Sequence, residues 1–422
     1  MFKKHPKGLM SLFFVEMWER FGFYIMSAIY VLYMDKDLGF DDSTKGTLYG
    51  VFLLAAYTFP LVGGYLGDWL IGQVNTIRAG AWMMTLGYIF LAISSINAIG
   101  FFYIGLILIA VGTGIFKVNM SVLVGNLYTG KPEIRDAGYN IYYMGVNVGA
   151  AIGPTAAGIL GYLFSNNYHI SFWAAAIGMA VSLLFIEIGK KNLIETRNNK
   201  IKIEKNIKAS EISKKEFTER IVTLIVLFFI AALFWVPFYQ NGFALTLFAE
   251  RSTAALIPPE TYVAFNAYFI LLLTPPLLWL FAKLRLKSME PSTPLKIFLG
   301  FLTMGISMLI MVWASAAGGN LDQPIMSPAW LIIAYLVITL AELLISPMGQ
   351  SYVSKVAPPK VKGLMMGGWF VATALGAFSA GIFGKLYSDV AHSEYFLVLA
   401  GISFFAAILS LIFMKKLKRF AD

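Results

Sequence analysis

Three ionisable side chains stand close together in an otherwise apolar stretch near the N-terminus, in the segment EMWERFGFY that begins at Glu16. On a helix, Glu16, Glu19 and Arg20 occupy positions i, i+3 and i+4 and therefore lie on one face. Phe23 or Tyr24 extends the same face by one turn. A carboxylate beside a cation stays charged, whereas one without a partner in a medium of low dielectric constant tends to keep its proton. The cluster can therefore exchange a proton when Arg20 changes partner. The alternative is a permanent ion-pair cluster that only fixes helix packing.

Two further ionisable residues, Lys117 and Glu342, fall in apolar segments far apart in the sequence. A charged side chain at the centre of a membrane-spanning helix costs about 2.5–3.5 kcal/mol on insertion scales, so such residues usually face the interior of a bundle and mark a transport path. Because their charges are opposite, we expect Lys117 and Glu342 to form a salt bridge that acts as a gate on one side of a central cavity. The alternative is two unrelated residues that each reach water.

The elements that must position these residues are transmembrane helices. The chain has 422 residues, of which 58% are hydrophobic and 13% are charged, and its mean hydropathy is +0.72. A hydrocarbon core roughly 30 Å thick requires about 20 apolar residues per helix. The sequence therefore predicts an all-α membrane protein with twelve transmembrane helices, at residues 9–34, 46–69, 77–97, 100–124, 138–164, 168–189, 220–249, 261–283, 295–317, 328–351, 363–388 and 393–414.

The longest polar connection divides these helices six and six. It predicts an N-terminal six-helix bundle (residues 1–189), a cytoplasmic connection (190–219) and a C-terminal six-helix bundle (220–422). Two six-helix halves are the architecture of the major facilitator fold, in which the substrate binds near the middle of the membrane. For the connection, the sequence leaves two alternatives: a solvated linker, or an amphipathic helix on the lipid headgroups.

The placement of the basic residues indicates the orientation of the chain, whose net charge is +10. If both termini face the cytoplasm, most of the 33 Lys and Arg residues fall in cytoplasmic segments. The exceptions are Lys36, Lys45, Arg251 and Lys385 toward the outside, and Arg20 and Lys117 within helices. This asymmetry follows the positive-inside rule. We therefore expect a multi-pass protein of the inner or plasma membrane with both termini in the cytoplasm, and no nucleic-acid partner.

Catalysis and metal binding find little support in the composition. Cysteine is absent, which excludes thiol chemistry and disulfide bonds. The histidines, His5, His169 and His392, are too scattered for a metal triad. We therefore expect no catalytic residues, no metal and no cofactor. A channel would call for a polar pore built from rings of repeated subunits, and the sequence shows a cluster of paired charges instead.

Seven segments, in the same order, resemble the signature motifs of the proton-dependent oligopeptide transporter family, also called the peptide transporter family, within the major facilitator superfamily. Together they extend over nearly the whole chain, and seven in order are specific. The first contains the ExxER motif of the family and the third its buried lysine. The segments are HPKGLMSLFFVEMWERFGFY, GGYLGDWLIG, VGTGIFKVNMSVLVGNLY, DAGYNIYYMGVNVGAAIGP, FWVPFYQNGFALTLFAERST, ELLISPMGQSYVSKVAP and GLMMGGWFVATALG.

The resemblance implies roles for individual residues. Glu16, Glu19 and Arg20 would couple protons and meet the C-terminal carboxylate of a peptide. Lys117 would be a second cation on the carboxylate side, and Glu342 would meet the peptide amino terminus. Amide side chains can satisfy the backbone of any peptide without reading its side chains, and aromatic walls accept varied side chains. The remaining candidate substrate contacts are Tyr24, Tyr57, Asn147, Gln240, Asn266 and Trp369.

The chain departs from the family pattern at the presumed extracellular gate. Tyr239 replaces an acid of the seventh helix, and Ser27 replaces the first-helix arginine that pairs with this acid in many members. Loss of one partner alone would leave the other as an unpaired buried charge, so losing both is consistent. Phe23 also replaces a tyrosine, and Trp69 and Gln73 stand where basic residues are common.

The resemblance implies a secondary active transporter, not an enzyme, that imports di- and tripeptides together with protons by alternating access. Protons would be the coupling ion, membrane lipids would be further partners, and a monomer would be the functional unit. The alternative keeps the scaffold but carries another small zwitterion or an organic anion, with altered or absent proton coupling.

Overall fold

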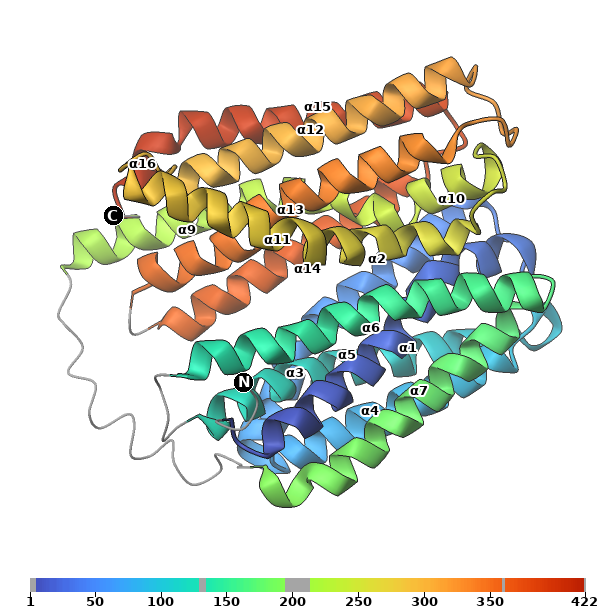
Figure 1. Ribbon diagram of the computed structural model, residues 1–422, viewed down its shortest axis with the longest axis horizontal. Coiled ribbons are helices and arrows are strands. Elements are labelled where there is room, and N and C mark those ends of the chain that lie inside the picture. The colour runs from blue at the N-terminus through green and yellow to red at the C-terminus, as the bar shows by residue number, and fades with distance from the viewer. Residues whose placement is uncertain (1–4, 129–133, 194–212, 359–360, 421–422) are drawn as a thin grey trace. The chain divides into compact units, whose positions relative to one another are not determined.

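The computed structural model describes residues 5–128, 134–193, 213–358 and 361–420 (Figure 1). These residues form helices joined by turns and short loops, with one isolated β-bridge between Thr253 and Met326 and no strand among them. The chain divides into two compact units. The first comprises Met1–Phe40 and Phe52–Lys208, and the second comprises Asp41–Val51 and Ala209–Asp422.

The first unit contains long helices together with short α, π and 3₁₀ segments. Its elements are α1 (Gly8–Lys36), the end of α2 (Asp42–Thr58), α3 (Pro60–Tyr65), the π-helix η2 (Leu66–Leu70), α4 (Gln73–Ala92), η3 (Ile96–Ala98), α5 (Ile99–Leu127), α6 (Arg135–Leu163), α7 (Tyr168–Gly189) and η5 (Lys190–Asn192). Within it, α1 packs against α5, α6 and α7, so the residues of α1 are buried on several sides.

Three glycines of α6 bring this helix against the backbone of α1. A Cβ atom at Gly145 or Gly153 would lie 2.8 Å from the carbonyl oxygen of Phe13 or Phe21, respectively. At Gly149, between them, a Cβ atom would overlap the carbonyl oxygen of Met17. Small residues four positions apart are a common way for two membrane helices to approach closely. The glycine stripe therefore fixes α6 directly beside the charged face of α1.

The second unit contains the remaining helices. Its elements are the start of α2, α9 (Lys214–Phe238), η6 (Tyr239–Gly242), α10 (Ala244–Arg251), η7 (Pro259–Thr261), α11 (Tyr262–Leu286), α12 (Thr293–Ala317), α13 (Pro328–Val356), α14 (Lys362–Gly384), α15 (His392–Ile412) and α16 (Met414–Lys418). Residues 41–51 join this unit through glycines. A Cβ atom at Gly46 would lie 2.5 Å from the carbonyl oxygen of Gly381, and one at Gly50 would lie 2.8 Å from that of Phe378. The first turns of α2 therefore lie directly on α14.

The prediction of an all-α membrane protein with twelve transmembrane helices is confirmed. Among the described residues, ten helical stretches are long and apolar enough to cross a membrane, and α1 and α4 complete the twelve. Helix α1 has 29 residues, but its charged residues lower its mean hydropathy. Helix α4 has 20 residues, close to the minimum length for a span.

Several helix boundaries differ from the predicted ones. The third helix ends at Ala92 rather than at residue 97, because the chain turns at Ser94, whose backbone carbonyl accepts a hydrogen bond from the Tyr33 hydroxyl (3.0 Å). The seventh predicted helix is interrupted by η6. Helix α9 begins inside the predicted connection because the Oγ atom of Ser213 caps its first turn, accepting from the Glu216 amide at 3.2 Å. Most of the connection, residues 194–212, lies outside the described residues. Both alternatives for it, a solvated linker and an amphipathic helix, therefore stay predictions.

Candidate functional site

The three charged residues predicted near the N-terminus lie together in α1. Their exposed fractions are 1% for Glu16, 0% for Glu19 and 3% for Arg20. The Arg20 guanidinium donates to both oxygens of Glu19, through Nε and through Nη2, the latter at 2.6 Å. Its Nε atom also lies 3.5 Å from Oε1 of Glu16. One arginine therefore holds two buried carboxylates, as the helical spacing predicted.

The two carboxylates are not held equally. Glu19 is bound by two nitrogens of Arg20, whereas Glu16 is reached at the longer distance by one. The second oxygen of Glu16, Oε2, is buried and makes no hydrogen bond within the described residues. Bidentate charge-assisted hydrogen bonds are the strong class of such contacts. Glu16 is therefore the weaker partner of Arg20.

Two cation–π contacts extend this cluster inside the first unit. The guanidinium of Arg20 lies 5.0 Å from the ring centroid of Phe23, and the Lys117 ammonium lies 5.6 Å from that of Tyr57. Lys117 and Tyr57 are both half-buried, and they come from α5 and α2. Aromatic faces at such distances attract a cation without neutralising its charge. Neither ring therefore neutralises the cation beside it.

Tyr24 and Asn147 complete the predicted set in the first unit. The Tyr24 ring packs edge-on against Phe23, and the side chain is half-buried. Asn147 lies on α6, two residues before Gly149, and is 4% exposed. Its Nδ2 atom donates to the Tyr143 carbonyl at 2.9 Å. Because Nδ2 carries two protons and this contact uses one, the amide keeps hydrogen-bonding capacity.

In the second unit, Asn266 of α11 links two residues of α13. Its Nδ2 atom donates to Oε2 of Glu342 at 2.9 Å and to Oγ1 of Thr339 at 3.1 Å. Glu342 is half-buried. Thr339 was not predicted, although it lies three residues before Glu342 on the same helix face, a spacing that would have indicated it. The amide thus fixes one oxygen of the Glu342 carboxylate.

Trp369 and Gln240 are also in the second unit, and both are buried. The Trp369 ring lies on the α13 backbone at Gly349, where a Cβ atom would overlap the ring. The amide of Gln240 donates to the carbonyl of Ala380 at 3.0 Å and accepts from the Tyr395 hydroxyl at 2.8 Å. The polar atoms of Gln240 therefore serve packing within this unit in the conformation described.

A polar cluster absent from the predictions joins the start of α2 to the end of α10. The carboxylate of Asp42 is bound by Arg251, Lys45 and the hydroxyl of Ser388. Lys45 is only 1% exposed. The sequence analysis predicted only that Lys45 and Arg251 lie toward the outside. We call Asp42, Lys45, Arg251 and Ser388 the α2 anchor. Among the described residues, no group of three or more acidic or histidine side chains is arranged to hold a metal ion.

Together, a chain of twelve transmembrane helices in two compact units, buried charges within helices and an amide beside a carboxylate are typical of a secondary transporter of the major facilitator type. Comparison with known proteins identifies the family. The profile of the POT family matches residues 74–212 and 190–398. This chain belongs to the POT family, which confirms the resemblance inferred from the motifs.

Relatives and solved structures agree with this assignment. The uncharacterized transporter YclF of Bacillus subtilis (strain 168) is 32% identical over 446 aligned positions, covering 90% of this chain and 89% of the relative. The di-/tripeptide transporter of Lactococcus lactis subsp. cremoris is 29% identical over 481 positions, covering 97% and 95%. A crystal structure of peptide transporter POT in complex with sulfate is 26% identical, with a TM-score of 0.89, and covers 100% of this chain and 97% of the solved one. The fold is thus that of a membrane transporter.

Proposed function

We propose that this protein imports di- and tripeptides together with protons by alternating access. The observation that carries the proposal is the binding of two buried carboxylates by one guanidinium, that of Arg20. Support for the substrate class comes from relatives such as the di-/tripeptide transporter of Lactococcus lactis.

The geometry of the Arg20 cluster suggests how a proton and a peptide influence each other. A peptide carboxylate that reaches Arg20 competes with Glu16 and Glu19 for the same guanidinium. The carboxylate that loses this cation remains buried, and a buried carboxylate without a partner is more stable in its neutral form. Peptide binding and proton uptake therefore favour each other. Glu16, the weaker partner of Arg20, is the first carboxylate that we expect to be displaced.

The two poles of a small peptide match the charges of the candidate residues. Arg20 and Lys117 are cations suited to the carboxylate end, and Glu342 is an anion suited to the amino end. Because Asn266 orients Glu342 through a hydrogen bond, the acid is held ready for an ammonium group. Asn147 and the aromatic rings of Tyr24, Tyr57 and Trp369 recognise peptides without selecting side chains. Such a site suits short peptides of similar length and varied sequence.

We further propose that the protein lies in the cell membrane (inner or plasma membrane) with both termini in the cytoplasm. We also propose that the monomer is the functional unit. The excess of Lys and Arg in the segments on one side supports this orientation. Protons are the coupling ion, and no cofactor is required.

The test is uptake of labelled dialanine into proteoliposomes with an imposed inward proton gradient. We expect the wild type to accumulate dialanine and Glu19→Gln to lose accumulation while it retains exchange between equal internal and external pools. Glu394→Gln makes the same chemical change at an exposed residue and should behave as wild type. Absence of dialanine uptake with and without the gradient would refute peptide transport and favour another small zwitterion or an organic anion as the cargo.

The pairing of Lys117 with Glu342 as a gate stays a prediction. Exchanging the charges, by combining Lys117→Glu with Glu342→Lys, should restore part of the dialanine exchange that each single substitution abolishes. No recovery in the double variant would indicate that the two residues act separately.

A further inference from the structure

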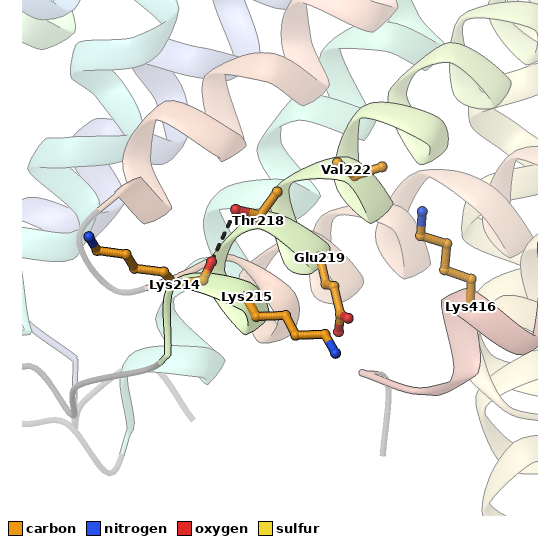
Figure 2. Close-up of a pocket in the computed structure, with 6 residues that line it drawn as sticks. All are labelled: Lys214, Lys215, Thr218, Glu219, Val222 and Lys416. Carbon is orange, nitrogen blue, oxygen red and sulfur yellow. Dashed lines mark hydrogen bonds between the residues drawn. The ribbon is translucent and has the colours of Figure 1, made fainter.

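A surface cavity of the second unit lies between the first turns of α9 and the helix α16 (Figure 2). Its volume is about 470 Å³. Figure 2 shows two of its lysines on the first turn of α9 and a third on α16, across the cavity. The lining residues are Lys214, Lys215, Thr218, Glu219, Val222 and Lys416. This cavity is separate from every residue of the proposed transport site.

The positive charge of the cavity is not compensated. Glu219, which lines it, is paired with Arg419 at 3.0 Å, and the neighbouring Glu216 is paired with Arg220 at 2.8 Å. Each acid is thus already matched by an arginine that does not line the cavity. In the described part of the chain, no ion pair includes Lys214, Lys215 or Lys416. The cavity therefore presents three ammonium groups to an anion.

Another basic group at a helix end shows the opposite arrangement. At the α11–α12 connection, the carboxylate of Glu290 binds both Arg285, at 2.5 Å, and Lys296, at 2.6 Å. The carboxylate of Glu290 thus provides a counter-charge for these two cations from within the protein. The α9–α16 cavity has no such acid left, so an external anion must supply the counter-charge.

The exposed face of α9 changes from basic to apolar along the helix axis. Lys215, Thr218 and Val222 follow one another at helical spacing, and Ile225 and Phe229 continue the same face. The exposed fractions rise from 40% at Val222 to 56% at Ile225 and 60% at Phe229. At a rise of 1.5 Å per residue, about 20 Å separate Lys215 from Phe229. This length suits an acyl chain rather than a small soluble ion.

Helix α15, which packs against α9 and precedes α16 in the chain, also has exposed apolar residues. Ile408 and Leu411 are each 55% exposed and Ile412 is 67% exposed, and they precede Lys416 in the chain. Lysine side chains near a helix end commonly reach the headgroup region while apolar residues contact the hydrocarbon. The lysines that line the cavity therefore lie at the ends of helical segments that carry exposed apolar residues.

We propose that this cavity binds the phosphate headgroup of an anionic phospholipid, whose acyl chains lie along the exposed stripes of α9 and α15. The chemistry that selects the ligand is a phosphate held by three ammonium groups. A free phosphate ion satisfies the same charges, but it leaves the apolar stripes without a partner. The proposal is independent of the transported substrate.

The test is binding of phosphatidylglycerol and phosphatidylcholine to the purified full-length protein, measured by native mass spectrometry in detergent. Attraction of about 1 kcal/mol per lysine near a membrane surface corresponds to roughly fivefold each, and to about a hundredfold for three. We expect the triple variant Lys214→Gln, Lys215→Gln, Lys416→Gln to lose most of the preference for phosphatidylglycerol. The control variant Lys283→Gln, Lys287→Gln, Lys355→Gln removes the same charge outside the cavity and should retain it.

Each outcome decides the proposal. An equal loss in both triple variants would show that only the net charge matters and would overturn the site. Displacement of phosphatidylglycerol by equimolar inorganic phosphate would assign the cavity to a soluble anion and refute the lipid. Because no transport is measured, a failure here is distinguishable from a failure of peptide uptake. A monodisperse elution profile of each variant checks that it is folded.

Discussion

Both terminal nitrogens of Arg251 donate to the carboxylate of Asp42, each across 3.1 Å, although the residues are 209 positions apart. The Asp42 side chain is 8% exposed and that of Arg251 is 17% exposed. Removing Arg251 takes two charge-assisted hydrogen bonds and one of two cations from the largely buried Asp42 carboxylate, and leaves Lys45 as the other cation. We predict that Arg251→Met lowers the stability of the protein by about 3 kcal/mol, seen as a lower thermal midpoint in detergent.

The control for this prediction is Asp389→Asn, which removes an exposed charge at the residue directly after Ser388 and should leave the midpoint nearly unchanged. Adding Asp42→Asn to Arg251→Met should cost less than the sum of the two single effects. Additive effects would show that the pair contributes no coupling energy.

A second prediction concerns the glycine stripe of α6. A side chain at Gly149 would meet the Met17 carbonyl and approach the Cβ atom of Arg20, which lies 2.8 Å from the position of a Cβ there. Gly149→Val should therefore push α6 away from α1 and abolish dialanine uptake. A methyl group at Gly100 meets no atom within 4 Å, so Gly100→Ala should retain uptake. Normal transport by Gly149→Val would show that the contact is dispensable.

A third prediction tests the orientation of Glu342. Asn266→Leu removes the amide that donates to this carboxylate at 2.9 Å. A hydrogen bond to a charged group contributes about 1.5–3 kcal/mol, so we expect the apparent affinity for dialanine to fall at least tenfold. Thr339→Val removes only the second contact of the amide and should have a smaller effect. Equal effects of the two substitutions in competition assays would contradict a special role for the Asn266–Glu342 bond.

A fourth prediction concerns Glu290, in the connection between α11 and α12. Hydrogen bonds from Arg285 and Lys296 lower the pKa of the Glu290 carboxyl to about 2, whereas an unfolded chain has a glutamate pKa of about 4.3. A lowered folded-state pKa stabilises the protein above the unfolded pKa, and this contribution disappears as the pH falls toward the folded value. Glu290→Gln should therefore cost about 1 kcal/mol at pH 7, and less at pH 3.5.

Thermal midpoints of wild type and Glu290→Gln over this pH range check the prediction. A difference between the two proteins that grows on acidification would contradict it. Glu394→Gln, at an exposed acid of the same unit, provides the reference for unspecific charge effects.

The local part of the site could be predicted from the sequence, because helical geometry fixes it. Glu16, Glu19 and Arg20 lie within about one turn, so their spacing determined that they share a face. The asymmetry between the carboxylates could not be foreseen, since side-chain geometry decides which one Arg20 binds through two nitrogens. Likewise, nothing in the polarity of FWVPFYQNGF separates α9 from α10, although Pro237 and Gly242 lie at the break.

The contacts that pair distant segments required the structure. Asn266 and Glu342 were both candidates through the family resemblance, but their hydrogen bond joins residues 76 positions apart. The α2 anchor could be predicted even less, because no sequence motif indicates it. Its aspartate, lysine and arginine resemble ordinary polar residues at helix ends, and only the close passage of Gly46 along Gly381 brings them together.

The α2 anchor can form only late in biosynthesis, because its residues are synthesised far apart in time. A ribosome adds about 5–20 residues per second, so the 209 residues between Asp42 and Arg251 take roughly 10–40 seconds to synthesise. Throughout this interval the nascent α2 carries Asp42 and Lys45 with neither Arg251 nor Ser388 yet made. We expect the newly inserted helix to keep this end at the water boundary until α10 and α14 emerge, so that the start of α2 completes its packing only after the second half of the chain has been translated.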